Sequence, residues 1–128
     1  MDSGAIRRRL AMGLAVLTAS GLIAVASPGH AEALDFCSGR PVRTLSFSTG
    51  SVQVYKHDGY VCAMTVAKNV AGRKTMSVSV QARGNRPAVD TGQYLHHAGP
   101  VTVHAGHRCV WVSGSVGSGS VSSGWILC

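Results

Sequence analysis

Histidines are the side chains of this sequence whose grouping most directly suggests chemistry. Four of the six lie close together in the chain: His96, His97, His104 and His107. Imidazole is a good ligand for zinc, copper and nickel, so the group could form a surface metal site. No carboxylate or cysteine sits beside them to complete a ligand set. We therefore interpret them as polar residues of turns and strand faces, and predict no metal site.

Hydrolytic catalysis would need side chains that the sequence does not bring together. The Gly-x-Ser-x-Gly turn that presents a serine nucleophile is absent from the chain. Glycoside hydrolysis needs two carboxylates flanking one bond. Asp58 precedes a glycine and Asp90 precedes Thr-Gly, so turn chemistry explains both better. We predict that the protein is not an enzyme and has no catalytic residue and no cofactor.

The four cysteines indicate two disulfides. They are Cys37, Cys62, Cys109 and Cys128. An even count in a short exported domain is typical of a disulfide framework, and no pair has the Cys-x₂₋₄-Cys spacing of a zinc site. Four cysteines allow three pairings, and the sequence alone does not select one. We predict Cys37–Cys62 and Cys109–Cys128, because each then closes a loop of about twenty residues, worth about 3 kcal/mol in the chain-entropy description.

The N-terminal segment has the three-part pattern of a secretory signal peptide. Three consecutive arginines, residues 7–9, precede an uncharged apolar stretch and small-residue cleavage sites that end at Ala31 or Ala33. The apolar stretch is short for a membrane-spanning helix and rich in alanine and glycine. The sequence therefore predicts a cleaved signal at residues 1–31. It predicts a single secreted domain at residues 32–128, with no membrane segment after cleavage.

The expected mature domain is basic. The whole chain has a formal net charge of +7, and loss of the signal leaves about +5. This balance favours anionic partners, such as a cell-wall or spore-surface polymer, although charge also serves ordinary solubility. Among the basic residues of the mature domain, only Arg73 and Lys74 are adjacent in the chain. This is not the run of basic residues that binds a phosphate backbone, so we expect no nucleic acid partner. The oligomeric state stays open.

The composition of the mature part is typical of strands and turns. Valine, threonine and serine dominate, and glycine or asparagine recurs between them. Residues 75–83 alternate most clearly, with Met76, Val78, Val80 and Ala82 on one face. Asp58-Gly59 is a strong hairpin signal. The expected strands are 42–48, 51–57, 60–68, 75–83, 100–105 and 108–113.

Two segments carry different expectations. Residues 84–93 hold glycine, asparagine, proline and aspartate and are expected to form a loop. The glycine- and serine-rich residues 113–124 are expected to form an exposed hairpin arm held by the last disulfide. With this arm the chain has about seven short strands. It is predicted to be all-β, a small antiparallel β-sandwich or barrel with two disulfides.

The two tryptophans allow two interpretations. Trp111 and Trp125 could stack on sugar rings as a carbohydrate platform. Each lies next to a cysteine or a short apolar run, and aromatic side chains bury large areas in small domains. We therefore favour packing in the core or on a sheet face, and the core over a sugar platform. The three tyrosines are expected to pack across strands.

A set of motifs in a fixed order resembles the spore-associated protein A family of streptomycetes. The matching segments are Cys37-Ser-Gly39, Cys62-Ala-Met-Thr65, Asp90-Thr-Gly-Gln-Tyr94, His97-Ala-Gly-Pro-Val101 and the stretch that ends at Cys128. The chain departs from the family at His97, where a tyrosine is usual, and in ending at the cysteine. The resemblance implies an exported actinobacterial protein found with spores or the cell surface. It implies no enzyme activity.

Three functions are compatible with these observations. The first is a secreted, non-enzymatic protein associated with a spore or cell surface. The second is a secreted binding module, either a binder of wall carbohydrate or a protease inhibitor whose loop 84–93 offers Arg86 and the preceding Arg83 to a trypsin-like protease. The third is a small toxin or antimicrobial, suggested by basicity and disulfides. We expect the first.

Overall fold

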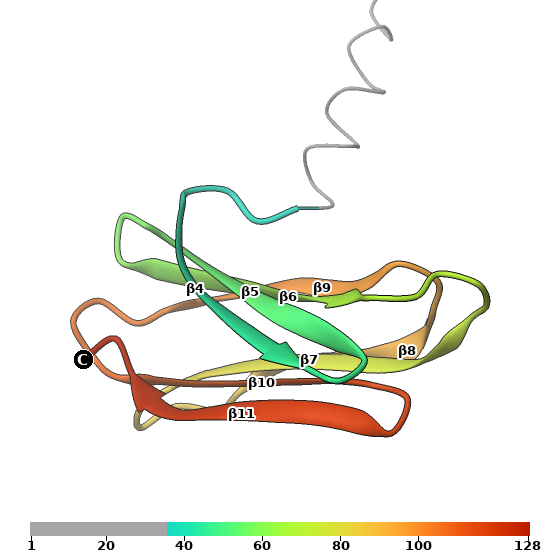
Figure 1. Cartoon of the computed structure of the whole chain (residues 1–128). Coiled ribbons are helices and arrows are strands. Elements are labelled where there is room, and N and C mark those ends of the chain that lie inside the picture. The colour runs from blue at the N-terminus through green and yellow to red at the C-terminus, as the bar shows by residue number, and fades with distance from the viewer. Residues whose placement is uncertain (1–35) are drawn as a thin grey trace, which may run out of the picture. The chain divides into compact units, whose positions relative to one another are not determined.

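The computed structural model describes residues 36–128, and the predicted signal peptide and cleavage sites lie outside them. The described chain folds into two antiparallel sheets of four strands that form two layers (Figure 1). One sheet has the order β4-β5-β6-β9 and the other β11-β10-β7-β8. The predicted all-β class is confirmed, as a sandwich. Residues 36–128 contain no helix that could cross a membrane.

Eight strands make up the two sheets. Their bounds are β4 (Arg40–Phe47), β5 (Gly50–His57), β6 (Tyr60–Ala67), β7 (Lys74–Ala82), β8 (Ala88–Tyr94), β9 (His97–His104), β10 (Val110–Val116) and β11 (Gly119–Ile126). The six strands expected from the pattern are all present, with ends that differ by a few residues. The chain enters the second sheet at β7, returns to the first at β9, and enters the second again at β10.

Alternation along the strands builds the core between the sheets. The inward residues of β7, from Met76 to Ala82, are fully buried. Val52 and Val54 from β5 and Val110 and Val112 from β10 meet them in one cluster. Small β-branched side chains suit this arrangement because they pack well on a pleated surface.

One polar side chain is buried in the core and joins the two sheets. Thr65 on β6 is fully buried, and its hydroxyl donates to the Ser77 carbonyl of β7 at 2.8 Å. Gly114 on β10 lies against this bond, since a Cβ there would overlap the Thr65 hydroxyl and a methyl group of Val52. A glycine at this point therefore allows the sheets to approach.

The β5–β6 turn forms as the sequence predicts. Asp58 and Gly59 have φ angles of 48° and 83°, the left-handed conformation that a tight two-residue hairpin requires at both positions. Aspartate and glycine tolerate it better than most residues. The turn sets the register in which His57 pairs with Tyr60.

Two expectations about loops were wrong. Residues 88–94, predicted as part of a loop, form the edge strand β8, which pairs with β7. Residues 113–124 do form a hairpin, but they belong to β10 and β11 rather than to an exposed arm. Gly114 and Gly119 are buried within it. In both segments tertiary contacts override a composition that favours loops.

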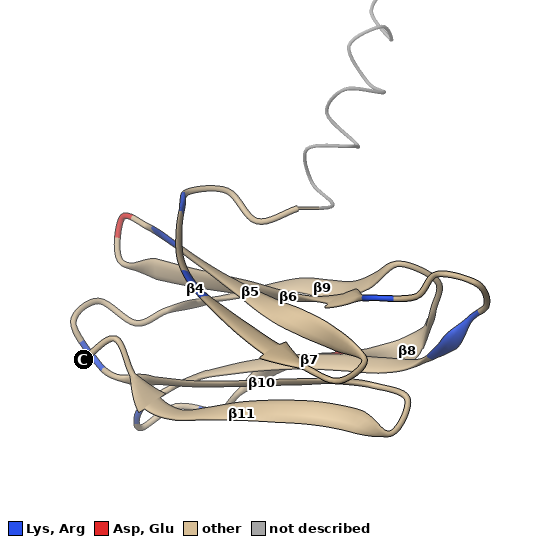
Figure 2. Cartoon of the chain, in the orientation of Figure 1, with Lys and Arg blue, Asp and Glu red and all other residues tan. Residues whose placement is uncertain are grey.

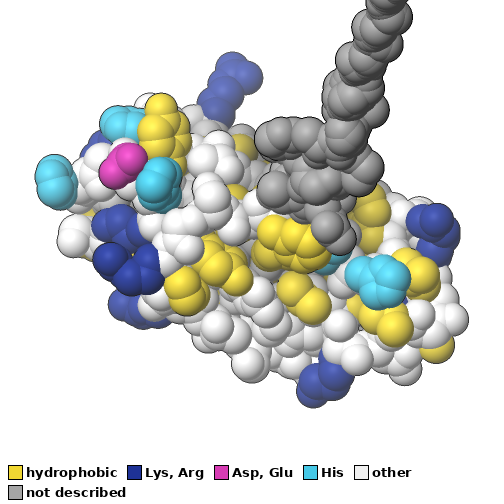
Figure 3. Space-filling model, turned by 90° about the horizontal axis from the view of Figure 1, so that it is seen from above, with side chains coloured by type: hydrophobic (Ala, Val, Ile, Leu, Met, Phe, Trp, Pro, Cys, Tyr) yellow, Lys and Arg dark blue, Asp and Glu magenta, His cyan; other side chains and the backbone are white. Residues whose placement is uncertain are grey.

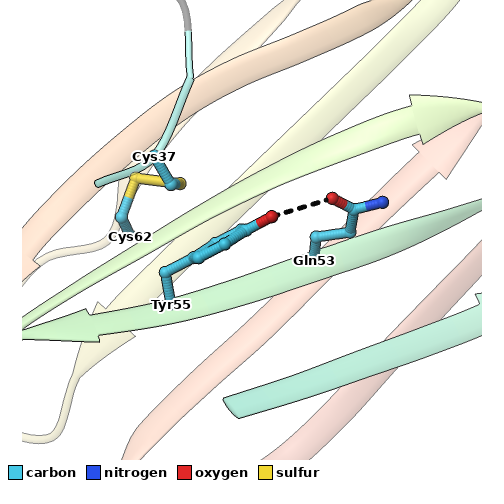
Figure 4. Close-up of a disulfide and its surroundings, with 4 residues drawn as sticks. All are labelled: Cys37, Gln53, Tyr55 and Cys62. Atoms are coloured by element: carbon cyan, nitrogen blue, oxygen red, sulfur yellow. Dashed lines mark hydrogen bonds between the residues drawn. A yellow bond between two sulfur atoms is a disulfide. The ribbon is translucent and has the colours of Figure 1, made fainter. Parts of the chain in front are cut away.

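Both predicted disulfides are confirmed. Cys37 is joined to Cys62 of β6, and Cys109 is joined to Cys128 at the end of the chain. Figure 4 shows the first bridge beside Tyr55 and Gln53, where the tyrosine hydroxyl donates to the Gln53 side-chain oxygen at 3.2 Å. Two bridges in a domain of this size are consistent with an extracellular protein.

Candidate functional site

The outer face of the sheet β11-β10-β7-β8 carries the two tryptophans. Trp111 on β10 and Trp125 on β11 are register partners, and their ring centroids lie 5.4 Å apart at an interplanar angle of 81°. They retain 39% and 38% of their full exposure. Of the two expected positions, the core is wrong, because Val110 and Val112 take the inward positions on either side of Trp111, and the two rings pack against each other on the sheet face instead.

Two polar side chains from β7 and its end complete this corner of the sheet. Gln81 is the register partner of Trp111 on the side away from Trp125. The guanidinium carbon of Arg83 lies 5.2 Å from the Trp125 ring centroid, within the range of a cation–π contact. The four residues Trp111, Trp125, Gln81 and Arg83 are called the tryptophan corner below.

Beside this corner the same face is covered by hydroxyl groups. Register places Ser113 between Ser79 and Ser122. Two residues further along β10, Ser115 lies between Ser77 and Ser120 on the same face. The hydroxyls of Ser77 and Ser115 lie 2.6 Å apart and share a hydrogen bond. The face thus carries an array of small donors and acceptors beside two exposed aromatic rings.

This combination of groups fits a sugar. The C–H face of a pyranose packs on an aromatic ring, which presents a negative π-face to it, while hydroxyl and amide groups hydrogen-bond to sugar hydroxyls. Because the planes of the two rings meet at an angle of 81°, the rings form a corner and not one continuous flat surface. Such a corner suits one residue of a flexible polymer better than a flat crystalline surface. The Arg83 guanidinium beside it favours a sugar that carries a negative charge.

The charges of the described residues also favour an anionic ligand. These residues include nine Lys and Arg side chains but only two acids, Asp58 and Asp90. The basic positions lie mainly toward the ends of the strands (Figure 2). Asp58 is in the exposed β5–β6 turn, where its carboxylate lies 3.2 Å from the His57 imidazole.

Asp90 has a structural role that the sequence did not indicate. One carboxylate oxygen accepts a 2.5 Å hydrogen bond from the Tyr94 hydroxyl, and the other accepts a 2.7 Å bond from the Gly99 amide. Asp90 therefore ties β8 of one sheet to β9 of the other. The hydrogen bond to Asp90 is the main reason that the pKa of Tyr94 is raised above its ordinary value, with desolvation and the Asp90 charge adding to it. The segments 90–94 and 97–101, two of the motifs that carry the family resemblance, meet at this junction.

No protein-family model, curated protein or solved structure significantly matches this chain. The resemblance to the spore-associated protein A family therefore stays a prediction that rests on the order of its motifs.

The four neighbouring histidines are separated by the length of β9. His96 and His97 lie at its start, and His97 stacks on Phe36 with 5.4 Å between ring centroids. His104 lies at its end and packs edge-on against Tyr60. Histidine side chains accordingly gather at both ends of the outer face of the sheet β4-β5-β6-β9 (Figure 3). Residues 36–128 contain no group of three or more His, Cys, Asp or Glu side chains arranged to hold a metal ion.

The tyrosines and the two arginines of the proposed inhibitor loop do not form a second constellation. Tyr55 and Tyr94 make the hydrogen bonds described above, and Tyr60 is exposed. The proposed inhibitor loop is reduced to the short connection between β7 and β8. Arg83, one of the two arginines that the loop was expected to offer to a protease, instead lies over the Trp125 ring.

Sequence reasoning missed the tryptophan corner, although one signal for it was present. In Val110-Trp111-Val112 the valines flank the tryptophan, so a strand that buries both valines must turn the tryptophan outward. No such local signal exists for the contact of Arg83 with Trp125, which joins residues far apart in the chain.

Proposed function

We propose that this is an exported, non-enzymatic protein that attaches to a cell or spore surface by binding an anionic carbohydrate polymer at the tryptophan corner. The single observation that carries the proposal is the exposure of Trp111 and Trp125 side by side on a face of hydroxyl groups. Exposed aromatic groups cost solvation free energy, and a contiguous set of them marks a binding surface.

The non-enzymatic part of the proposal is supported by the positions of the acids. Asp58 lies in an exposed turn, and both oxygens of Asp90 are occupied by hydrogen bonds that hold β8 to β9. These two carboxylates therefore do not form the facing pair that glycoside hydrolysis requires. Binding without turnover uses groups that the face does present, namely rings, hydroxyls, an amide and a guanidinium.

Two parts of the corner are expected to contribute differently. The rings supply contact area for any sugar, while Arg83 adds attraction only for a charged one. Trp111→Ala and Trp125→Ala are therefore expected to weaken binding to charged and neutral polysaccharides alike. Arg83→Gln keeps a polar side chain and is expected to weaken binding to the charged polymer alone.

Affinity electrophoresis of the protein purified from culture medium tests this proposal. Polygalacturonate serves as the anionic polymer, dextran as the neutral one and crystalline cellulose as a flat surface. We expect polygalacturonate to retard the protein most, and Trp111→Ala to lower its affinity about tenfold, which corresponds to about 1.4 kcal/mol. Tyr60→Ala is the matched control, because it removes an exposed aromatic ring from the other sheet.

The proposal fails if Tyr60→Ala weakens retardation as much as Trp111→Ala does. It also fails if single-stranded oligonucleotides, whose bases stack on aromatic rings, bind the corner more tightly than any of these polysaccharides. Fractionation of spores, mycelium and medium tests the location separately.

A further inference from the structure

A second feature of the molecule lies at the end of the sandwich where β6 ends and β7 begins. It is a hollow of about 490 Å³, and its walls include three basic residues, Lys68, Arg73 and Lys74. The β4–β5 turn and the β10–β11 turn supply the other walls, so both sheets contribute to it. This feature is called the basic hollow below.

No acid neutralises the basic hollow within the described residues. Neither of the two described acids lines it, because Asp58 lies in the β5–β6 turn beside His57 and both oxygens of Asp90 accept hydrogen bonds where β8 meets β9. Basic residues in the wall of one hollow, with no acid among them, give the hollow a positive potential that favours an anionic ligand. The concentration of charge thus points to a ligand rather than to internal pairing.

The cations are not all equally mobile. The Lys74 ammonium donates to the Asn69 carbonyl at 2.8 Å and to the Leu95 carbonyl at 3.4 Å, so its position is fixed and one N–H is left. Arg73 donates from one terminal nitrogen to the Gln93 carbonyl at 3.4 Å and keeps its other donors. Lys68 is exposed and makes no side-chain hydrogen bond to a described residue.

The rim of the basic hollow is held in place across the two sheets. The Thr49 hydroxyl donates to the Val116 carbonyl at 2.7 Å, and the Lys68 amide donates to the Thr49 carbonyl at 3.0 Å. The Gly117 amide donates to the Thr75 carbonyl at 2.8 Å. Because these bonds fix the walls before a ligand arrives, little ordering would be needed on binding.

We infer that the basic hollow binds a phosphate group. A guanidinium and two ammonium groups can meet the several oxygens of a tetrahedral anion, and Arg73 can present two parallel N–H donors to one phosphate. The hydroxyls of Ser48 and Ser118, which make no hydrogen bond to other described residues, add neutral donors at the rim. This site is separate from the tryptophan corner and does not depend on the proposed function.

Backbone amide chemical shifts, measured during titration of the secreted protein, test this inference. The probes are inorganic phosphate and poly(glycerol phosphate), with acetate as the carboxylate comparison. We expect saturable shifts at the amides of residues 72–74 and 117–118 with both phosphate probes. A larger affinity for the polymer would identify a phosphodiester chain as the natural source of the group, and a larger affinity for the free ion would identify a small phosphate.

Matched charge variants distinguish a site from general attraction. Lys68→Glu with Arg73→Glu is expected to lower phosphate affinity at least tenfold. Arg40→Glu with Arg86→Glu makes the same change in net charge with residues outside the hollow, and is expected to leave affinity within about twofold. Folding of each variant is checked by the shifts of the β7 core amides.

Three results would overturn the inference. One is an equal loss in both double variants, which would mean that only net charge matters. Another is the absence of saturable shifts at the hollow with either phosphate probe. The third is an affinity for acetate equal to that for phosphate, which would exclude a phosphate site.

Discussion

The two faces of the sheet β11-β10-β7-β8 are built from alternate residues of the same strands and differ in almost every property. On β10, Val110, Val112 and Gly114 face the core, while Trp111 and Ser113 face solvent. The inner face is packed so closely that position 114 has room only for glycine, whereas the outer face is exposed and carries serine hydroxyls beside the two tryptophan rings. The contrast predicts that stability and the proposed binding depend on different residues of one strand, so neighbouring substitutions can separate them.

The largest expected effect is at the close approach of the sheets. Gly114→Val places a side chain where the Thr65 hydroxyl and Val52 already lie, and should destabilise the protein by about 3 kcal/mol. Ser113→Val, one residue away on the outer face, should change stability by less than about 0.5 kcal/mol. Urea denaturation measures both. Equal losses in the two variants would show that the faces are not distinct.

A second adjacent pair compares stability with binding. Val112→Ala removes buried methyl groups and should cost about 2 kcal/mol of folding free energy with polysaccharide affinity retained. Trp111→Ala should cost at most about 1 kcal/mol of folding free energy, the value of a cross-strand aromatic pair, and lower the polysaccharide affinity about tenfold. Thermal unfolding and affinity electrophoresis on the same samples give both quantities. If Val112→Ala loses polysaccharide affinity at temperatures where it is still folded, then stability and binding do not depend on separate faces of β10.

The two described acids provide a third contrast. Asp90→Asn keeps one acceptor oxygen for the Gly99 amide, but the charge-assisted bond from the Tyr94 hydroxyl becomes a neutral one in which that hydroxyl accepts from the new amide group, at a cost of about 1 kcal/mol. Asp58→Asn changes only an exposed turn and should cost less than about 0.5 kcal/mol. Denaturation midpoints compare them. A stable Asp90→Asn variant would remove the structural role assigned to Asp90.

The smallest expected effect depends on pH. Because the pKa of Tyr94 is raised in the folded protein, the native state keeps this proton to higher pH than the unfolded chain does. The stability that follows is fully present below the ordinary pKa of 10.0 and is lost as pH rises through the folded pKa. Tyr94→Phe should therefore lose less stability than the parent above pH 10, measured by urea denaturation at several alkaline values. Tyr60→Phe is the control. If the stability of the parent protein falls with pH in parallel with that of Tyr94→Phe, the raised pKa of Tyr94 is contradicted.

Much of the fold could be predicted because its signals are local. The alternation from Met76 to Ala82, the Asp58-Gly59 turn and the even cysteine count each led to features that the structure contains. The strand β8 could not be found this way. Its Asp90 and Gly92 are poor strand residues, and they are explained only by contacts with Gly99 and with the Tyr94 ring.

The candidate sites were less predictable than the fold. Exposure of Trp111 follows from burial of the valines beside it, but its pairing with Trp125 depends on the β10–β11 register. The basic hollow combines the ends of both sheets, and its residues Thr49, Lys68 and Gly117 are brought together only by folding. A sequence pattern reports which face a residue occupies, whereas a site depends on which strands become neighbours.

The most direct test of the account is the tryptophan fluorescence of the unmodified protein during titration with polygalacturonate. The chain contains two tryptophans, and both lie at the proposed site, so their emission reports on this corner alone. We predict a saturable change in emission with polygalacturonate, a weaker one with dextran, and none with inorganic phosphate, which would occupy the basic hollow. Binding of polygalacturonate that retards the protein in a gel but leaves the emission of both tryptophans unchanged would contradict the account.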